Sequence, residues 1–283
     1  MTWLRFVELT NKTLRSLWVG EHLGHFELGC LLSLVEAGNA VGLYVYSKPA
    51  NCPSEIQILD ANEILHEREV FHTASSPGTF SGFSNLFRYR MLQVSESIWV
   101  DTDVLSAPAG IPEEPYLFGW ESSEFINGAV LSAPQSSGFL STLVAQVRSK
   151  DTKELKWGEI GPKLITKTAT SMGLENYAKP REVFYPLAYN EVWKLFSESH
   201  SDSLEHRFAG SSTVHLWNEV LRKASRPVKK GFPHPKSYLG KRFVQLGLDP
   251  SGHEIINPEW AETTWRLEQN RWYSGVKRFL RKG

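Results

Sequence analysis

Two aspartates, Asp101 and Asp103, stand two positions apart directly after the apolar run Ile98–Val100. A short apolar run that stops at polar residues is typical of a buried strand, and open α/β sheets bind ligands beyond the carboxyl ends of their strands. Carboxylates in that position can hold a divalent cation, and the cation can hold a diphosphate. The alternative interpretation is a solvated turn, because two aspartates at this spacing are common by chance.

Phosphatases with an aspartyl nucleophile share this layout, and the first aspartate of the pair would then attack phosphorus. In such enzymes the pair usually lies near the start of the chain, and a second acidic pair follows later. Here Asp101 lies well inside the chain, Leu105 stands where Thr or Val is expected, and no later Asp-Asp pair exists. We therefore favour a metal site over a phosphatase.

The composition of the chain narrows the classes of protein and of function that remain. The 283 residues are 41% hydrophobic and 22% charged, which is typical of a globular protein. Lys+Arg and Asp+Glu both count 31, so no excess of positive charge favours a nucleic-acid partner. Two cysteines, Cys30 and Cys52, cannot form a disulfide framework or a four-thiolate zinc site. With no signal-peptide pattern and no apolar run of membrane-spanning length, we expect a cytoplasmic protein.

Apolar runs alternate with helical patterns along the first half of the chain. This alternation predicts an α/β fold with a mostly parallel sheet and helices on both faces, and these elements would position the aspartates. The second half is less regular, with a strand end expected at 184–186 and an exposed connection at 229–236. Strands are expected at 14–19, 41–46, 55–59, 98–100, 116–120 and 129–133, and helices at 26–37, 85–94, 138–147 and 164–172.

Further short motifs surround the aspartate pair and occur in a fixed order. They are Ser16-Leu17-Trp18-Val19-Gly20, the segment 83–92 before the pair, Asn127-Gly128-Ala129-Val130-Leu131, Gly161-Pro162 with Thr166, and His215-Leu216-Trp217. This series resembles the sugar-nucleotide glycosyltransferases with a D-x-D motif, namely glycosyltransferase family 32 and its α-1,4-galactosyltransferase-like relatives. The segment 83–92 with the pair is similar to the family pattern S-D-x-x-R-x-x-x-L…G-G-x-x-x-D-x-D.

Two positions depart from the family pattern. Asn85 stands where the family has Asp, and Glu96-Ser97 replaces the Gly-Gly before the strand. An amide at position 85 can still hydrogen-bond, but it brings no charge. An alternative function is therefore a catalytically degenerate homologue that acts as a sugar-binding or partner-binding module.

The resemblance implies a single glycosyltransferase domain of GT-A type over residues 1–283. A nucleotide-sugar-binding half would cover about 14–135, an acceptor-side half 136–225 and a C-terminal extension 226–283. It also implies a metal-dependent, retaining transfer of a hexose from a nucleoside-diphosphate sugar, with UDP-sugar as the expected donor. Mn²⁺ or Mg²⁺ would be the cofactor, and the acceptor a glycan or lipid-linked molecule in polysaccharide or lipopolysaccharide biosynthesis.

The resemblance also assigns roles to single residues. Those expected to bind the donor are Trp18, Gly20, Asn85, Arg88, Asp101 and Thr102. Those expected to take part in catalysis are Asp101, Asp103 and Asn127, and the loop before Asn127 also holds Glu121 and Glu124. The alternative for Trp18 is a packed tryptophan beside the turn at Gly20, and for Arg88 a salt bridge on a solvated helix face. The alternative for Asn127 and the two glutamates is a plain surface role.

The H-x-W element implies that His215 returns to the metal beside Asp101 and Asp103. An imidazole is a softer ligand than oxygen, so it would favour Mn²⁺ over Mg²⁺. Trp217 is expected to point to the opposite side and pack inward. The alternative is a histidine that only forms a hydrogen bond.

The end of the chain carries an amphipathic pattern. Trp265, Trp272, Val276 and Phe279 form one helical stripe, and Lys277, Arg278, Arg281 and Lys282 add positive charge. This segment is a candidate for peripheral contact with the inner face of a membrane, which would suit a lipid-linked acceptor. The interpretation we favour is that the stripe packs on the body of the protein, because a Trp-rich helical stripe is usually core.

Overall fold

The computed structural model describes residues 13–73, 78–156, 158–223 and 228–267. Its centre is a six-stranded sheet in the order β3-β2-β1-β4-β7-β6, in which β1 to β4 pair in parallel and β7 runs antiparallel to both of its neighbours. The strands are β1 (Thr13–Trp18), β2 (Ala40–Val45), β3 (Gln57–Asp60), β4 (Ile98–Val100), β6 (Leu117–Trp120) and β7 (Ile126–Ser132). The expected α/β fold with a mostly parallel sheet is confirmed, and its arrangement is consistent with the GT-A type.

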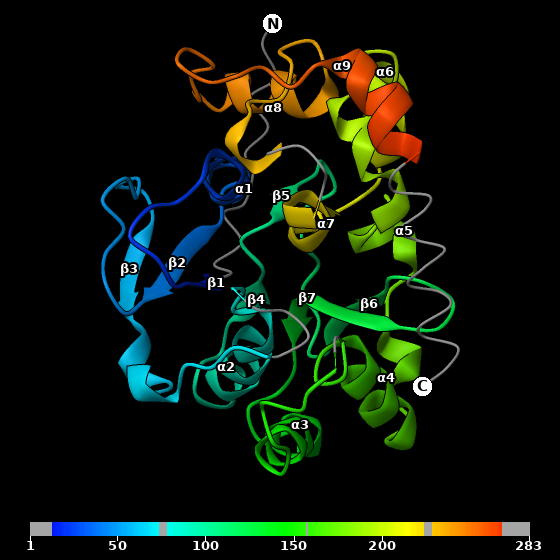
Figure 1. Ribbon diagram of the computed structural model, residues 1–283. Helices are drawn as coiled ribbons and strands as arrows, with labels where there is room; N and C mark the ends of the chain where they lie inside the picture. Colours follow the sequence, from blue (N-terminus) through cyan, green and yellow to red (C-terminus); the bar gives the residue numbers. More distant parts are fainter. Residues whose placement is uncertain (1–12, 74–77, 157, 224–227, 268–283) are drawn as a thin grey trace, which may run out of the picture.

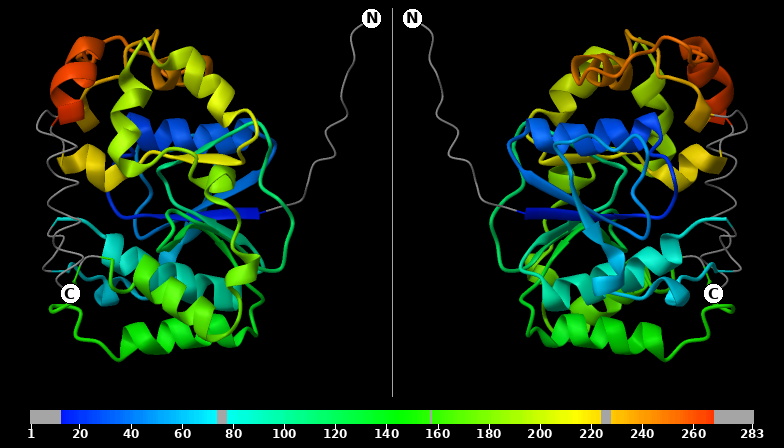
Figure 2. Two further views of the ribbon diagram at one scale, coloured as in Figure 1. Left: turned by 90° about the vertical axis from the view of Figure 1, so that its right-hand side faces the viewer. Right: turned by 90° about the vertical axis from the view of Figure 1, so that its left-hand side faces the viewer.

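Helices cover both faces of the sheet, as expected (Figure 2). Helix α1 (His25–Glu36) packs Leu31 and Leu34 against Leu14 of β1 in one buried cluster. On the other face, α2 (Ser81–Val94), α3 (Gly138–Arg148) and α4 (Pro162–Ser171) join Leu17 of β1 in a second cluster. Leu14 and Leu17 lie on opposite faces because side chains alternate along a strand.

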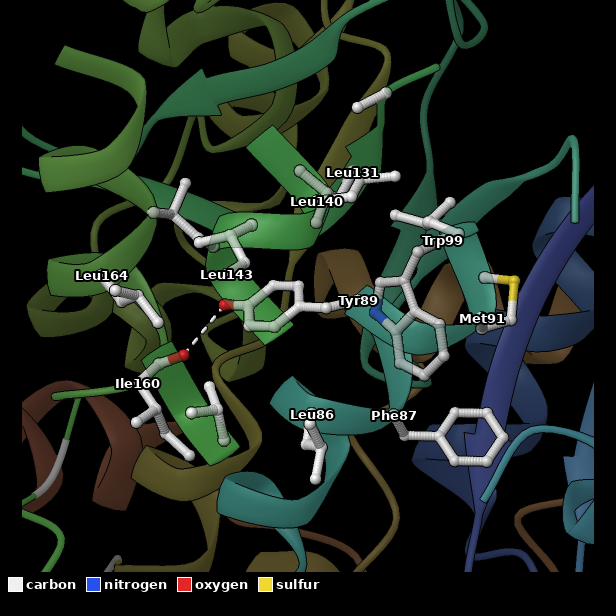
Figure 3. Packing of buried hydrophobic residues seen from close by; sticks show 14 of the residues in the cluster. Leu86, Phe87, Tyr89, Met91, Trp99, Leu131, Leu140, Leu143, Ile160 and Leu164 are labelled. Atoms are coloured by element: carbon white, nitrogen blue, oxygen red, sulfur yellow. Dashed lines mark hydrogen bonds between the residues drawn. The ribbon is translucent and has the colours of Figure 1, made fainter. Parts of the chain in front are cut away.

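The second cluster fixes α2 beneath the sheet (Figure 3). Tyr89 of α2 is fully buried, and its hydroxyl donates to the carbonyl of Ile160 at 2.9 Å. Phe87 lies beside Trp99 of β4, with ring centroids 6.2 Å apart. This packing sets the rotation of α2, and therefore the direction in which its polar residues point.

The second half forms further helices around a third buried cluster that includes Phe26 and Cys30 of α1. The α-helices are α5 (Arg181–Phe184), α6 (Ser201–Phe208), α7 (Asn218–Lys223), α8 (Tyr238–Gln245) and α9 (Pro258–Trp260). The 3-10 helices are Ala61–Glu63, Glu67–Glu69, Glu175–Tyr177, Tyr189–Phe196 and Val228–Lys230, and Ala261–Trp265 is a π-helix.

A two-stranded antiparallel ribbon joins the two halves. Its strands are β5 (Val104–Ser106), which directly follows the aspartate pair, and β8 (Thr213–His215). The three residues of β5 are buried, and its pairing partner lies more than a hundred positions away in the chain, so no local pattern predicted it.

Two expectations for the second half are wrong. Residues 184–186 are not a strand end, because Phe184 closes the short helix α5 and the Tyr185 N–H donates to the Arg181 carbonyl at 2.8 Å. The segment 229–236 is not simply an exposed connection, because Phe232 is fully buried in the third cluster. An apolar ring between charged residues was the signal that this segment packs inward.

Glu191 provides a test of how the second half is held together. Its carboxylate accepts from the Nη1 and Nη2 of Arg207, at 3.1 and 3.0 Å, and from the Lys194 Nζ at 2.6 Å. Burial opposes ionisation, but these donors prevail and lower the pKa of Glu191 to about 2. Because the unfolded carboxyl has a pKa of about 4.3, the stabilisation is present above that pH and is lost as the pH falls towards 2.

We expect Glu191→Gln to lose about 1–2 kcal/mol of unfolding free energy at pH 7. Urea unfolding at pH 7 and near pH 2 would measure the difference between variant and wild type, which should shrink at the lower pH. Glu182→Gln, at an exposed position on α5, is the control. A loss that is equal at both pH values would contradict the assignment.

Candidate functional site

The aspartate pair lies at the carboxyl end of β4, as the sequence predicted. The Asp101 N–H donates to the Ala129 carbonyl of β7 at 2.8 Å, which is the last contact before the chain leaves the sheet. The Val104 N–H then donates to the Asp101 carbonyl at 3.1 Å and closes a turn. This turn places Asp101 and Asp103 at the same edge of the sheet and starts β5.

His215 reaches the pair through the ribbon. Val104 of β5 is paired with His215 of β8, and the Leu216 N–H donates to the Asp103 carbonyl at 2.8 Å. The His215 Nε2 lies 3.2 Å from the Asp103 Oδ2. One potential ligand atom from each of Asp101, Asp103 and His215 lies within 4.8 Å of the other two.

The chemistry of these three groups fits a divalent cation. Asp103 and His215 are each 7% exposed, and the His215 Nδ1 has no hydrogen-bond partner among the described residues. Burial lowers the pKa of His215, but the nearby carboxylates of Asp103, Asp101 and Glu121 prevail and raise it. Burial raises the pKa of Asp101, and the neighbouring Asp103 adds to the effect. Two carboxylates and an imidazole held together in this way are a suitable ligand set for Mn²⁺ or a similar ion.

Arg88 lies beneath Asp101 and not on a solvated helix face. Its Nη2 is 2.9 Å from the Asp101 Oδ1, and the Trp99 Nε1 donates to the same oxygen at 2.6 Å. The guanidinium carbon is 5.1 Å from the centre of the Trp99 ring. Further N–H groups donate to the carbonyls of Gly128 and Ser84. Arg88 therefore ties the Asp101 carboxylate to α2 and β7.

Asn127 lies on β7 beside this edge and is 8% exposed. Its Nδ2 donates to Glu121 at 2.5 Å, and its Oδ1 accepts from the Ala129 N–H at 2.7 Å. Burial raises the pKa of Glu121, while Asn127, His215 and Arg181 act in the opposite direction. Glu124, in contrast, is exposed. The structure therefore brings Glu121 and Asn127 together and leaves Glu124 outside.

The G-P-x-x-x-T element is also in contact with the site region. Pro162 starts α4, a position that suits proline because its missing N–H would be unpaired there. Thr166 accepts from the Ile126 N–H of β7 at 2.8 Å. A Cβ atom on Gly161 would lie 3.2 Å from the amide of Asn85, whose Nδ2 donates to the Ser81 carbonyl at 2.9 Å. Asn85 and Gly161, far apart in sequence, are therefore neighbours.

Trp18 ends β1 and Gly20 follows it; because β1 is the parallel neighbour of β4, both residues belong to the same edge of the sheet. The half-buried Trp18 donates from Nε1 to the His22 carbonyl at 3.1 Å. A Cβ atom on Gly20 would lie 3.2 Å from the same nitrogen, so the backbone passes close to the indole. Thr102 is half-buried between the two aspartates.

The expected orientation of Trp217 is wrong. Its ring centroid is 4.3 Å from that of His215, so the two rings are neighbours and do not point to opposite sides. Residues two apart in an extended chain face the same way. In addition, Trp217 has a φ of 54°, which turns the chain directly after β8. Its Nε1 donates to the Leu187 carbonyl at 2.9 Å.

Sequence reasoning missed Asn218 and Glu27. The Asn218 N–H donates to the Asp103 Oδ2 at 2.7 Å, and its Nδ2 donates to the Glu27 Oε1 at 3.0 Å. Asn218 directly follows the H-x-W element, which was the available signal. Nothing in the local sequence distinguishes Glu27 from a surface glutamate on α1, although it is 2% exposed.

Comparison with known families supports the same reading of the site. Residues 138–234 match the family model described as the alpha 1,4-glycosyltransferase conserved region. The resemblance to the D-x-D glycosyltransferases is confirmed. The match covers α4, His215 and Trp217, and the structure places this conserved region against the aspartate pair that precedes it. A search among curated proteins gives no match.

The C-terminal stripe is only partly within the described residues. Trp265 is 1% exposed, with its ring centroid 5.4 Å from that of Trp260 and 4.8 Å from that of Phe196. Membrane contact is therefore the wrong interpretation for Trp265, which belongs to the third cluster. Trp272, Val276 and Phe279, with the basic residues around them, lie outside the described residues. Within the described part of the chain, no helix has the length and apolar character needed to cross a membrane.

Proposed function

We propose that the protein is a metal-dependent, retaining glycosyltransferase that moves a hexose from a nucleoside-diphosphate sugar, with UDP-sugar as the first candidate. The observation that carries the proposal is the cluster of Asp101, Asp103 and His215 at the carboxyl end of β4. The match of residues 138–234 to a glycosyltransferase region supports the reaction class. The acceptor would be a glycan or a lipid-linked molecule in polysaccharide or lipopolysaccharide biosynthesis.

The cation that we assign to these residues is Mn²⁺, with Mg²⁺ as the alternative. A bound cation would stabilise the negative charge that develops on the departing diphosphate without a proton transfer. Asp101 and Asp103 would hold it through carboxylate oxygens, and the imidazole of His215 would favour Mn²⁺. Arg88 and Trp99 would orient the Asp101 carboxylate and oppose the rise in its pKa that burial causes.

The residues around this cluster have proposed roles in binding the donor. Trp18 and Gly20 would contact the nucleotide, and Thr102 would lie beside the diphosphate. Asn85, on α2 and beside Gly161 at the start of α4, would hydrogen-bond a sugar hydroxyl. Asn127, held by Glu121, would face the reacting sugar and support the positive charge that develops at its anomeric carbon.

The test is release of UDP from a panel of UDP-sugars, with Mn²⁺, with Mg²⁺ and after chelation by EDTA. We expect release with at least one donor, dependence on the metal, and loss of release in Asp103→Ala. Proton NMR of the transferred sugar would show whether the anomeric configuration is retained. If UDP-sugars bind but none releases UDP, the result favours the alternative function, a catalytically degenerate sugar-binding module. The presence of Asn85 where the family has Asp already favours that alternative.

We also propose peripheral membrane contact through the basic residues of the C-terminal segment, with a location at the inner face of the membrane. We expect the full chain to float with vesicles that contain anionic lipid, because positive charge near such a surface is attracted to it. A chain that ends at Leu267 keeps the buried Trp265 and should float less. Equal flotation of the two chains would contradict the proposal.

A further inference from the structure

The chain around Asp103 contains a second connection that does not involve His215. The Asp103 Oδ2 accepts from the main-chain N–H of Asn218 at 2.7 Å, in addition to its contact with the His215 Nε2 at 3.2 Å. A main-chain donor belongs to the folded backbone and cannot rotate away as a side chain can. The Asn218 N–H therefore restricts the orientation of the Asp103 carboxylate.

The side chain of Asn218 extends this connection to helix α1. Its Nδ2 donates to the Glu27 Oε1 at 3.0 Å, whereas its Oδ1 is buried and has no hydrogen-bond partner among the described residues. A buried polar atom without a partner is uncommon in native structures and calls for an explanation. The two hydrogen bonds that Asn218 makes, to Asp103 and to Glu27, explain why an asparagine stands here although its Oδ1 has no partner among the described residues.

Glu27 is itself held in place. It is 2% exposed, in the first turn of α1, and a Cβ atom on Gly24 would lie only 2.5 Å from its Oε2. Gly24 ends the loop that begins at Trp18 and Gly20, the proposed nucleotide contacts. The Glu27 carboxylate therefore lies between that loop and Asn218.

The backbone directly before Asn218 has an unfavourable conformation that turns the chain toward Asp103. Trp217 is the one non-glycine residue in the described part of the chain with a positive φ, at 54°. Non-glycine residues in this region cost free energy and cluster at functional sites. The turn at Trp217 comes directly before Asn218, whose N–H lies at the Asp103 carboxylate.

We propose that Asn218 is a positioning residue of the metal site, which joins Glu27 of α1 to the metal ligand Asp103 and so couples the loop after β1 to the cation. This inference rests on the proposed metal-dependent function. Neither residue touches the reacting atoms in this proposal. Their effect is on the orientation of Asp103, and it should therefore appear first in metal affinity.

The experiment measures binding of Mn²⁺ alone to the full chain by electron paramagnetic resonance of the free ion. We expect Asn218→Ala and Glu27→Met, which removes the oxygen that accepts from the Asn218 Nδ2, each to weaken binding by about 10–100-fold, the usual effect of removing a group that orients a ligand. The dissociation constant of the double variant for Mn²⁺ should exceed that of the weaker-binding single variant by no more than about twofold. Both changes break the same hydrogen bond, the one between Asn218 and Glu27, so their effects should not add. Arg222→Ala, on the exposed side of α7, should bind as wild type does.

The outcomes separate this inference from the proposed function. If wild type does not bind Mn²⁺, the metal-dependent function fails, and the positioning role fails with it. If wild type binds and both single variants bind equally well, only the positioning role is overturned. Effects that add fully in the double variant would also overturn it, because they would show two independent roles. Thermal unfolding identifies a variant that fails to fold, and Glu27→Met, which nearly preserves side-chain volume but removes the acceptor oxygen, then decides the question.

Discussion

Asp103→Asn should lower metal-dependent UDP release by at least about a hundredfold, because the loss of a charged ligand removes several kcal/mol of charge stabilisation in the transition state. Asn has nearly the same size as Asp and can still accept from the Asn218 N–H, a bond of 2.7 Å in the wild type. The metal-free variant should therefore unfold close to the wild-type temperature. The rise in that temperature on addition of Mn²⁺ should be lost.

The measurement pairs UDP release with thermal unfolding, each with Mn²⁺ and with EDTA. Asp202→Asn is the matched control, because its side chain is 92% exposed on α6 and lies outside the cluster. If Asp103→Asn is destabilised without metal and keeps its Mn²⁺ response, Asp103 is a structural residue. Loss of UDP release without any loss of Mn²⁺ binding would instead assign Asp103 to the donor.

The aspartate pair could be placed from the sequence because its position depends on local chemistry. Ile98–Val100 is an apolar run that ends at polar residues, and a buried strand must leave the sheet where such residues begin. The parallel order of β1 and β4 follows from the alternation of strands and helices. The family resemblance then supplied the link to His215, which spacing alone could not supply.

The ribbon of β5 and β8 could not be predicted, because two strands of three residues carry little periodic pattern and their pairing is nonlocal. The same limit applies to Asn218 and Glu27, since their contact depends on how α1 packs against the segment after β8. Trp217 was misplaced because residues two apart in an extended chain face the same way, so its ring lies beside that of His215 and not opposite it.

Arg88 illustrates a different limit. A helix pattern predicted α2, but it could not distinguish an arginine on the solvated face from one turned under the sheet. The decision depends on the packing of Tyr89 and Phe87, which sets the rotation of the helix (Figure 3). Charged residues are rarely buried unless they are paired, and the partner, Asp101, is the residue that the motif itself supplies.

Arg88→Met should therefore lower the free energy of unfolding of the metal-free protein by about 3–5 kcal/mol, the usual cost of removing one partner of a buried ion pair. The side chains of Arg88 and Asp101 are 7% and 21% exposed, so water cannot fully replace the lost partner. Arg90→Met on the same helix is the control, because the half-buried Arg90 donates to the neutral Gln93 and its removal should cost much less. Urea unfolding in EDTA would measure both losses.

A double variant identifies the cause of the loss. If the cost comes from an Asp101 carboxylate left without its positive partner, then Asp101→Asn in the Arg88→Met background should recover part of the lost stability. Asn keeps an oxygen that can accept from the Trp99 Nε1, so the hydrogen bond of 2.6 Å in the wild type has a replacement. If the double variant is as unstable as the sum of the two single variants, the charge on Asp101 is not what Arg88 compensates. The contacts of Arg88 with Gly128 and with the Trp99 ring would then account for its burial.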